Sequence, residues 1–222
     1  MEVHAENIKK EFLRKSKGSN VFEAVKSCNF ELSKGCLSVI KGRSGGGKST
    51  LLNMLSGILE PTEGKIFYDD TDIYALGDEK LSVFRNENIG FIPQGRSSVA
   101  SLNVFENILL PNILYGKKNE ERALELMEEF GILDLKDVYP KELSGGELRR
   151  MAIARSLINS PKVLFADEPT GDLDDENTKV VFEALKKIAH NGCAVLMVTH
   201  EEGAQKYADR IFRMDAGVLN VG

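Results

Sequence analysis

The chain has 222 residues, of which 42% are hydrophobic and 28% are charged, a composition typical of a folded globular protein. Its formal net charge of −5 argues against sequence-independent binding to nucleic acid, for which a basic surface supplies most of the affinity. We therefore expect no nucleic-acid partner.

Cysteines and apolar runs further limit the classes of protein that the sequence fits. Cys28, Cys36 and Cys193 are widely spaced and form no CxxC pattern, so we interpret them as small core residues rather than disulfide partners or zinc ligands. The sequence shows no apolar signal segment, and no apolar run approaches the ~20 residues that span a bilayer. Any role at a membrane is thus expected to come through a partner.

The N-terminal quarter of the sequence is rich in strand signals. Apolar and alternating stretches predict strands over residues 3–8, 22–32, 37–40 and 65–68. Lys34-Gly35, between the second and third of these stretches, predicts a hairpin turn. We expect this part of the chain to be largely β.

A glycine-rich loop follows the strand predicted at residues 37–40. It reads Gly42-Arg43-Ser44-Gly45-Gly46-Gly47-Lys48-Ser49-Thr50, the G-x-x-x-x-G-K-[ST] pattern that wraps backbone N–H groups around nucleotide phosphates. The start of the helix predicted at residues 51–55 adds partial positive charge. We expect Lys48 to reach the β- and γ-phosphates and Ser49 to hold Mg²⁺. An ordinary glycine-rich turn is the weaker interpretation, because strand, loop and helix follow in the order that the motif requires.

The rest of the chain alternates between helical and β patterns. Residues 95–159 have helical spacing, with apolar residues among many glutamates, and are predicted to form an inserted helical subdomain. Short apolar strands follow at residues 163–166 and 194–198, each trailed by a helix-like stretch. This alternation predicts an α/β fold with a mostly parallel sheet, whose core is formed by residues 1–94 and 160–222 of a single domain.

Two carboxylates, Asp167 and Glu168, end the strand predicted at residues 163–166. In phosphate-loop enzymes an acidic residue at this place holds the metal, and a neighbouring carboxylate polarises the attacking water. We assign these roles to Asp167 and Glu168 respectively. A solvated acidic turn is the alternative, and the presence of Lys48 and Ser49 weakens it.

The segment Leu143-Ser144-Gly145-Gly146-Glu147 precedes an amphipathic helix. Ser144 and Glu147 form a capping box, so the segment can be explained as a well-started helix. A helix start needs no consecutive glycines, however, whereas a second phosphate-binding surface needs exposed backbone N–H groups and a free hydroxyl. The pair Gly145-Gly146 therefore favours a binding role.

His200 follows the strand predicted at residues 194–198, so it is expected at the same sheet edge as Asp167. A neutral imidazole can donate one hydrogen bond there. Thr199 and Glu202 have the spacing of a second capping box, which explains Thr199 and leaves His200 available.

These motifs together resemble the nucleotide-binding subunit of an ABC transporter, over nearly the whole chain. In order, they are the phosphate loop, Gln94 after Phe91-Ile92-Pro93, the Leu143–Glu147 signature, Asp167-Glu168, Gly171-Asp172-Leu173-Asp174 and His200. The resemblance implies a P-loop, RecA-like core with an N-terminal antiparallel β subdomain and an inserted helical subdomain.

The resemblance also implies a head-to-tail dimer with two ATP molecules and Mg²⁺ between its subunits. Ser144, Gly145 and Gly146 of one copy would then complete the site begun by the phosphate loop of the other. Gln94 would sense Mg²⁺ and the γ-phosphate and contact a transmembrane permease, and His200 would bond the γ-phosphate. Asp174 would tie the two sites together.

Two regions are less settled by the resemblance. Phe12 stands where this family usually has an aromatic that stacks on adenine, and Phe22 is its rival; we favour Phe12. The stretch Gly95–Leu102 carries several serines where relatives usually have bulkier apolar residues, so interface details there do not transfer from the family.

The expected function is ATP hydrolysis that powers export or extraction by a separate permease, closest to the lipoprotein-release, macrolide-export and peptide-antibiotic-resistance transporters. The subunit is expected on the cytoplasmic face of the membrane. A relative that regulates cell-division or cell-wall enzymes through a membrane protein, without transport, is the alternative. A DNA-repair or translation ATPase is disfavoured because the chain has no long heptad insertion, zinc cysteines or basic arm.

Overall fold

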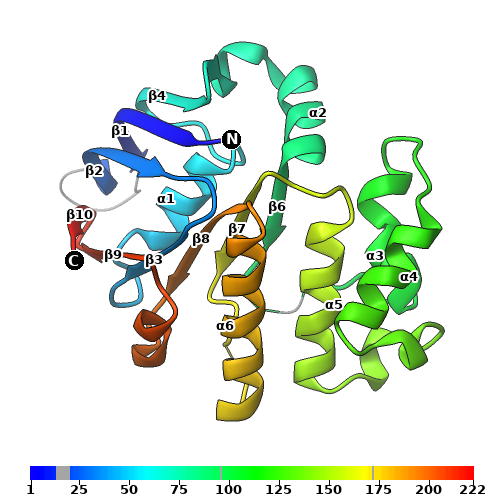
Figure 1. The fold of residues 1–222 in the computed structure, drawn as a ribbon. Helices are drawn as coiled ribbons and strands as arrows, with labels where there is room; N and C mark the ends of the chain where they lie inside the picture. The colour runs from blue at the N-terminus through cyan, green and yellow to red at the C-terminus, as the bar shows by residue number, and fades with distance from the viewer. Residues whose placement is uncertain (14–20, 96, 172) are drawn as a thin grey trace.

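The computed structural model describes residues 1–13, 21–95, 97–171 and 173–222. Arg96, in the loop after Gln94, and Asp172, in the stretch before Asp174, lie outside the described residues. Two sheets and a set of helices make up the rest (Figure 1).

The first sheet is antiparallel and has four strands in the order β2-β1-β4-β5. Its strands are β1 (Val3–Leu13), β2 (Val21–Leu32), β4 (Glu63–Tyr68) and β5 (Thr71–Asp72). The predicted N-terminal strands are thus confirmed and are longer than expected. The predicted hairpin at Lys34-Gly35 is wrong, because β2 lies in this sheet and the following strand lies in the other. Gly35 N–H donates to the Cys193 carbonyl at 3.1 Å, which fixes the turn against the second sheet.

The second sheet has six strands in the order β10-β9-β3-β8-β7-β6. They are β3 (Leu37–Lys41), β6 (Ile89–Ile92), β7 (Val163–Asp167), β8 (Ala194–Thr199), β9 (Arg210–Asp215) and β10 (Val218–Val221). All neighbours pair in parallel except β9 and β10. Every residue of β7 and β8 is buried, as expected for central parallel strands covered on both faces. The mostly parallel sheet predicted from the sequence is confirmed.

Alternate residues of the central strands enter two separate cores. In β7, Leu164 and Ala166 face one cluster, while Val163 and Phe165 face the other. The first cluster packs under α6 (Asp175–His190), and the second under α1 (Lys48–Leu55) and the antiparallel sheet. The period of two along each strand therefore places a helical layer on one face of the sheet and α1 with the first sheet on the other.

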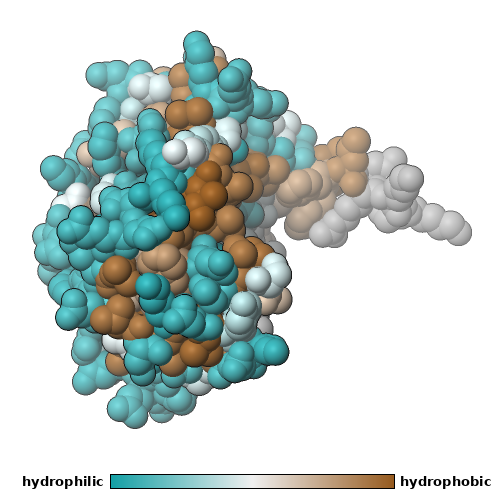
Figure 2. Space-filling view, turned by 90° about the vertical axis from the view of Figure 1, so that its right-hand side faces the viewer, coloured by the Kyte–Doolittle hydropathy of each residue, from teal (hydrophilic) through white to brown (hydrophobic). Residues whose placement is uncertain are grey.

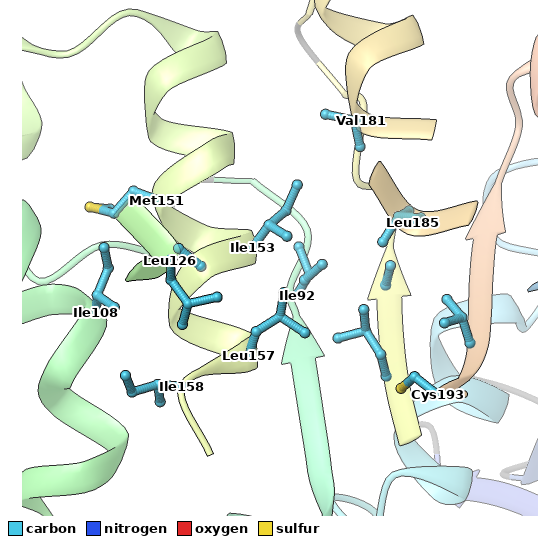
Figure 3. Packing of buried hydrophobic residues seen from close by; sticks show 14 of the residues in the cluster. Ile92, Ile108, Leu126, Met151, Ile153, Leu157, Ile158, Val181, Leu185 and Cys193 are labelled. Atoms are coloured by element: carbon cyan, nitrogen blue, oxygen red, sulfur yellow. The ribbon is translucent and has the colours of Figure 1, made fainter. Parts of the chain in front are cut away.

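The segment between β6 and β7 is helical, as predicted. It contains α3 (Val104–Ile113), α4 (Glu120–Glu129), α5 (Gly145–Leu157) and the short 3-10 helices at Leu133–Leu135 and Pro140–Glu142. Side-chain caps start α3, α4 and α5, and the predicted capping box of Ser144 and Glu147 is present. Figure 3 shows Ile92 of β6 beside Ile153 and Leu157 of α5, so the core of this segment continues into the sheet.

The remaining helices connect these parts. Helix α2 (Asp78–Asn88) leads into β6, and 3-10 helices occupy Ile73–Leu76 and Glu202–Lys206. Among the helices that the structure describes, none has the length and apolar character to cross a membrane.

Candidate nucleotide-binding site

The glycine-rich loop joins β3 to α1, in the strand–loop–helix setting that the motif requires. Gly45 and Gly47 have φ of 77° and 102°, a conformation that L side chains rarely adopt. A Cβ at Gly42 would lie 2.0 Å from the Met214 carbonyl oxygen, and one at Gly47 would lie 2.3 Å from that of Ala24. Glycine is therefore required by close backbone approach as well as by φ.

Lys48 folds back across the loop. Its Nζ donates to the carbonyl oxygens of Gly42 at 2.8 Å and Arg43 at 3.2 Å, and it lies 3.6 Å from Glu168 Oε1. The side chain is only 6% exposed. The ammonium is thus held at the mouth of the loop, where a phosphate oxygen can replace a carbonyl as its partner.

Ser49, in the first turn of α1, contacts Asp167 at the end of β7. Ser49 Oγ donates to Asp167 Oδ1 at 3.0 Å. Burial raises the pKa of Asp167 above its usual range, the Ser49 hydroxyl opposes that shift, and the charge of Glu168 adds to it. A bound cation would reverse this balance, because it favours the ionised carboxylate.

The oxygen atoms of Ser49 and Asp167 are suitable ligands for Mg²⁺. Within the described residues no group of three or more His, Cys, Asp or Glu side chains forms a metal cage. Mg²⁺ prefers hard oxygen ligands, keeps several waters and binds through one or two protein groups plus substrate phosphates. Ser49 Oγ and the Asp167 carboxylate, adjacent to the phosphate loop, have this chemistry.

Glu168 and His200 form a second pair beside Lys48. His200 Nδ1 lies 2.9 Å from Glu168 Oε2, and the His200 backbone N–H donates to the same oxygen at 3.3 Å. Glu168 has φ of 44°, and its own N–H donates to the Val198 carbonyl at 2.9 Å. The prediction that His200 lies at the sheet edge of Asp167 and Glu168 is confirmed.

This contact constrains the proton on His200. An ionised Glu168 accepts from Nδ1–H, so a neutral imidazole presents Nε2 as an acceptor. Donation from Nε2 to a phosphate oxygen then requires a second proton or the other tautomer. The capping box predicted for Thr199 and Glu202 is wrong, since the 3-10 helix begins after Glu201 and Thr199 Oγ1 accepts from the Glu201 N–H at 3.0 Å.

A cleft of about 350 Å³ gathers most of the predicted phosphate-site residues. It is lined by Phe22, Ala24, Ser44, Gly45, Gly47, Lys48, Ser49, Thr50, Gln94, Glu168 and His200. Gln94 is thereby placed at the phosphate loop. Ala24 was missed by sequence reasoning, because nothing in the sequence signals that its carbonyl approaches Gly47.

Phe22 lines this cleft, whereas Phe12, which we favoured as the adenine platform, does not. The two residues are direct partners in the antiparallel pairing of β1 and β2, so they lie on the same face of the sheet. Phe12 is 39% exposed, and Lys10 Nζ lies 5.5 Å from its ring centroid. Phe22 thus borders the cleft directly, and Phe12 is its neighbour across the strand pair.

The signature residues lie outside the phosphate-loop cleft. Ser144, Gly145 and Gly146 form the start of α5, and Asp174 caps the start of α6. Gly145 instead borders a second cleft, of about 280 Å³, together with Gly95, Ser97 and Gly171. Within the residues that the structure describes, the phosphate-loop cleft and the start of α5 therefore do not meet in one chain.

Two arginines of α5, which sequence reasoning missed, contact the chain on either side of Gln94. Arg149 donates to the Pro93 carbonyl at 3.3 Å. Arg155 donates to the Ser97 carbonyl at 2.9 Å and to Ser97 Oγ at 2.7 Å. Burial lowers the pKa of Arg155, as expected for a guanidinium that donates to the neutral groups of Ser97. The loop that carries Gln94 is thus bound to the signature helix.

The fold and this site define a P-loop nucleotide-binding protein. Its lysine and hydroxyl follow β3 and its two carboxylates lie at the end of β7, in one parallel sheet with β8 between the two strands. A family model described as "ABC transporter" matches residues 25–171. The chain therefore belongs to the ABC transporter family and is an ATPase cassette of it.

Individual relatives match along almost the whole chain. The lipoprotein-releasing system ATP-binding protein LolD of Aquifex aeolicus is 40% identical over 218 residues, covering 97% of this chain and 94% of the relative. The putative hemin import ATP-binding protein HrtA of Staphylococcus aureus is 37% identical and covers 99% of both chains. A dimeric ATP-binding cassette in a post-hydrolysis state, bound to ADP and phosphate, superposes with a TM-score of 0.88 at 31% identity, covering 99% of this chain and 98% of that one.

Proposed function

We propose that the chain is the ATP-hydrolysing subunit of a membrane transporter and works as a head-to-tail homodimer with ATP and Mg²⁺ between two copies. The observation that carries this proposal is the separation, within one chain, of the Lys48 cleft from the signature surface at the start of α5. A partner copy in the opposite orientation would bring them together. The dimeric cassette bound to ADP and phosphate supports this arrangement.

Within each site we assign the phosphate loop from Gly42 to Thr50 to the nucleotide phosphates, with Lys48 on the β- and γ-phosphates. Ser49, Asp167 and Gln94 would hold Mg²⁺, which neutralises charge on the phosphates when bound. Ser144, Gly145 and Gly146 of the partner copy would contact the γ-phosphate, with Asp174 linking the two sites. Phe12, with Phe22 beside it in the sheet, would stack on adenine.

For the chemical step, Glu168 would accept the proton of the attacking water. His200 would orient the Glu168 carboxylate through the contact between its Nδ1 and Glu168 Oε2. Water forms the new bond to the γ-phosphorus as the bond to the ADP oxygen breaks, so ADP and phosphate leave. Glu168→Gln keeps the size of the side chain and one acceptor oxygen but removes the base. We expect ATP affinity within about threefold of the parent and turnover lower by roughly 10²–10⁴-fold. Normal turnover by this variant would refute the role of Glu168.

A permease segment would dock on the face formed by the helical segment, about residues 95–159, and the edge strand β6. Apolar side chains gather on this face (Figure 2). Ile113 is 48% and Leu114 is 70% exposed at the end of α3, and Ile58, Phe91 and Tyr115 border a groove next to them. An exposed apolar patch of this kind is typical of a protein interaction site.

The relatives named as lipoprotein-releasing subunits support extraction or export as the direction of work, on the cytoplasmic side of the membrane. Purification of the chain with its membrane partner, followed by reconstitution into vesicles, tests this. ATP-dependent release or movement of substrate by the complex is the expected result. ATP hydrolysis with no movement of any substrate would favour a regulator of cell-wall enzymes instead.

A further inference from the structure

The starts of α5 and α6 meet at one side chain, Asn177. The two helices run side by side with their N-terminal ends at the lower side of the molecule in Figure 1. The first carries the signature glycines, and the second is capped by Asp174. Asn177, in the first turn of α6, lies between Asp174 and the signature helix.

The Asn177 side chain uses both ends of its amide. Its Nδ2 donates to Asp174 Oδ1 at 3.1 Å and to Oδ2 at 2.9 Å, and its backbone N–H donates to Oδ1 at 2.8 Å. Its Oδ1 accepts from Arg150 Nη1 at 3.5 Å, from within α5. The backbone and side-chain hydrogen bonds from Asn177 hold the pKa of Asp174 below its usual range. An amide suits this position, because its NH2 group can donate to a carboxylate while its oxygen accepts from a guanidinium.

Gly146 lets this side chain approach α5 closely. A Cβ at Gly146 would lie 2.4 Å from Asn177 Oδ1 and 2.9 Å from its Cγ. Any residue but glycine there would push the amide away from the signature. The second signature glycine therefore has a packing reason within the chain, in addition to the exposed N–H that phosphate binding requires.

We propose that Asn177 is a positioning residue that fixes Asp174 relative to the signature, so that both reach the partner copy as one preformed surface. This inference rests on the proposed head-to-tail dimer. In that dimer the signature completes the partner's nucleotide site, and Asp174 links the two sites. A positioning error of about 1 Å can cost about 10²-fold in rate, so a fixed spacing of these two groups is valuable to both sites.

The test compares dimer formation with nucleotide binding by the single chain. In the Glu168→Gln background, which accumulates the ATP-bound state, Asn177→Ala removes both side-chain links, and Lys179→Ala on the exposed face of the same helix is the control. Asn177 does not line the phosphate-loop cleft, so we expect the affinity of the monomer for a fluorescent ATP analogue to stay within about twofold. We expect the dissociation constant of the ATP-bound dimer to rise roughly tenfold or more, because hydrogen bonds to a charged group are lost.

Asn177→Asp sharpens the test. It keeps the size and the acceptor facing Arg150 but replaces the two donated hydrogens with a charge that repels Asp174. We expect it to weaken the dimer at least as much as Asn177→Ala.

A dimer as strong as that of the background chain in either variant would overturn the inference. So would a loss of monomer affinity and of thermal stability that parallels the loss of dimer, since that indicates a merely structural role. If the Glu168→Gln chain itself forms no dimer with ATP, the proposed function fails first and the inference falls with it.

Discussion

The glycine-rich loop offers a matched pair of substitutions. Gly45 and Gly47 both have positive φ, at 77° and 102°. A Cβ at Gly45 has no other heavy atom within 4 Å, whereas a Cβ at Gly47 would lie 2.3 Å from the Ala24 carbonyl oxygen and 2.8 Å from Met214 Cε. Gly45→Ala therefore tests backbone conformation alone, and Gly47→Ala tests conformation together with a backbone clash.

The expected losses in the free energy of unfolding follow from the backbone conformation and from the clash. An L side chain in the left-handed region costs roughly 1–2 kcal/mol, and both variants carry this cost. Real Cβ contacts essentially never fall below 3.0 Å, so Gly47→Ala must separate the loop from β2, at a further cost of about 1–3 kcal/mol. We expect a loss in the free energy of unfolding of about 1–2 kcal/mol for Gly45→Ala and about 2–5 kcal/mol for Gly47→Ala.

Denaturant unfolding of the nucleotide-free chains, followed by far-ultraviolet circular dichroism, measures both losses. Thermal unfolding gives a second readout, because for a chain of this size each 1 kcal/mol lowers the midpoint temperature by about 2–4 °C. Working without nucleotide keeps contacts to phosphate out of the comparison. Equal losses in the two variants, or a larger loss for Gly45→Ala, would refute the argument that the Ala24 carbonyl closes the space at Gly47.

Two further predictions concern charge and the apolar face. Because burial raises the pKa of Asp167, the stability linked to this group is present below its unfolded pKa and is lost as the pH rises through its folded pKa. Asp167→Asn should therefore unfold at a higher temperature than the parent at pH 7 without nucleotide or metal, and the difference should vanish below about pH 4; a less stable variant at pH 7 would contradict this. Leu114, which is 70% exposed, lies on the proposed permease surface, so Leu114→Glu should leave the hydrolysis rate of the isolated subunit unchanged and lower recovery of the permease complex at least about tenfold. Unchanged recovery would exclude this residue from the docking surface.

The sequence predicted best those features that local spacing determines. The phosphate loop carries its own strand and helix signals, so the positions of Lys48 and Ser49 followed from nine consecutive residues. Glu168 and His200 follow two strands that pair in parallel, and the ends of such strands share one edge of a sheet, which is why their contact was predictable.

Features that depend on distant parts of the chain were not predicted. After β2 the chain crosses to the second sheet, where the Gly35 N–H donates to the carbonyl of Cys193, a residue far away in the sequence. Helix α2 was not predicted, because its sequence shows no clear apolar period. Leu81 is the one buried residue within its span. The contacts of Arg155 with Ser97 and of Asn177 with Asp174 and Arg150 join residues whose partners no local pattern reveals.

The most direct test of the composite ATP site is the oligomeric state of Glu168→Gln with and without ATP, measured by size-exclusion chromatography with light scattering. The separation of the Lys48 cleft from the signature surface within one chain predicts a monomer without nucleotide and a dimer with ATP. A chain that binds ATP and remains a monomer at every concentration would contradict a site built from two copies.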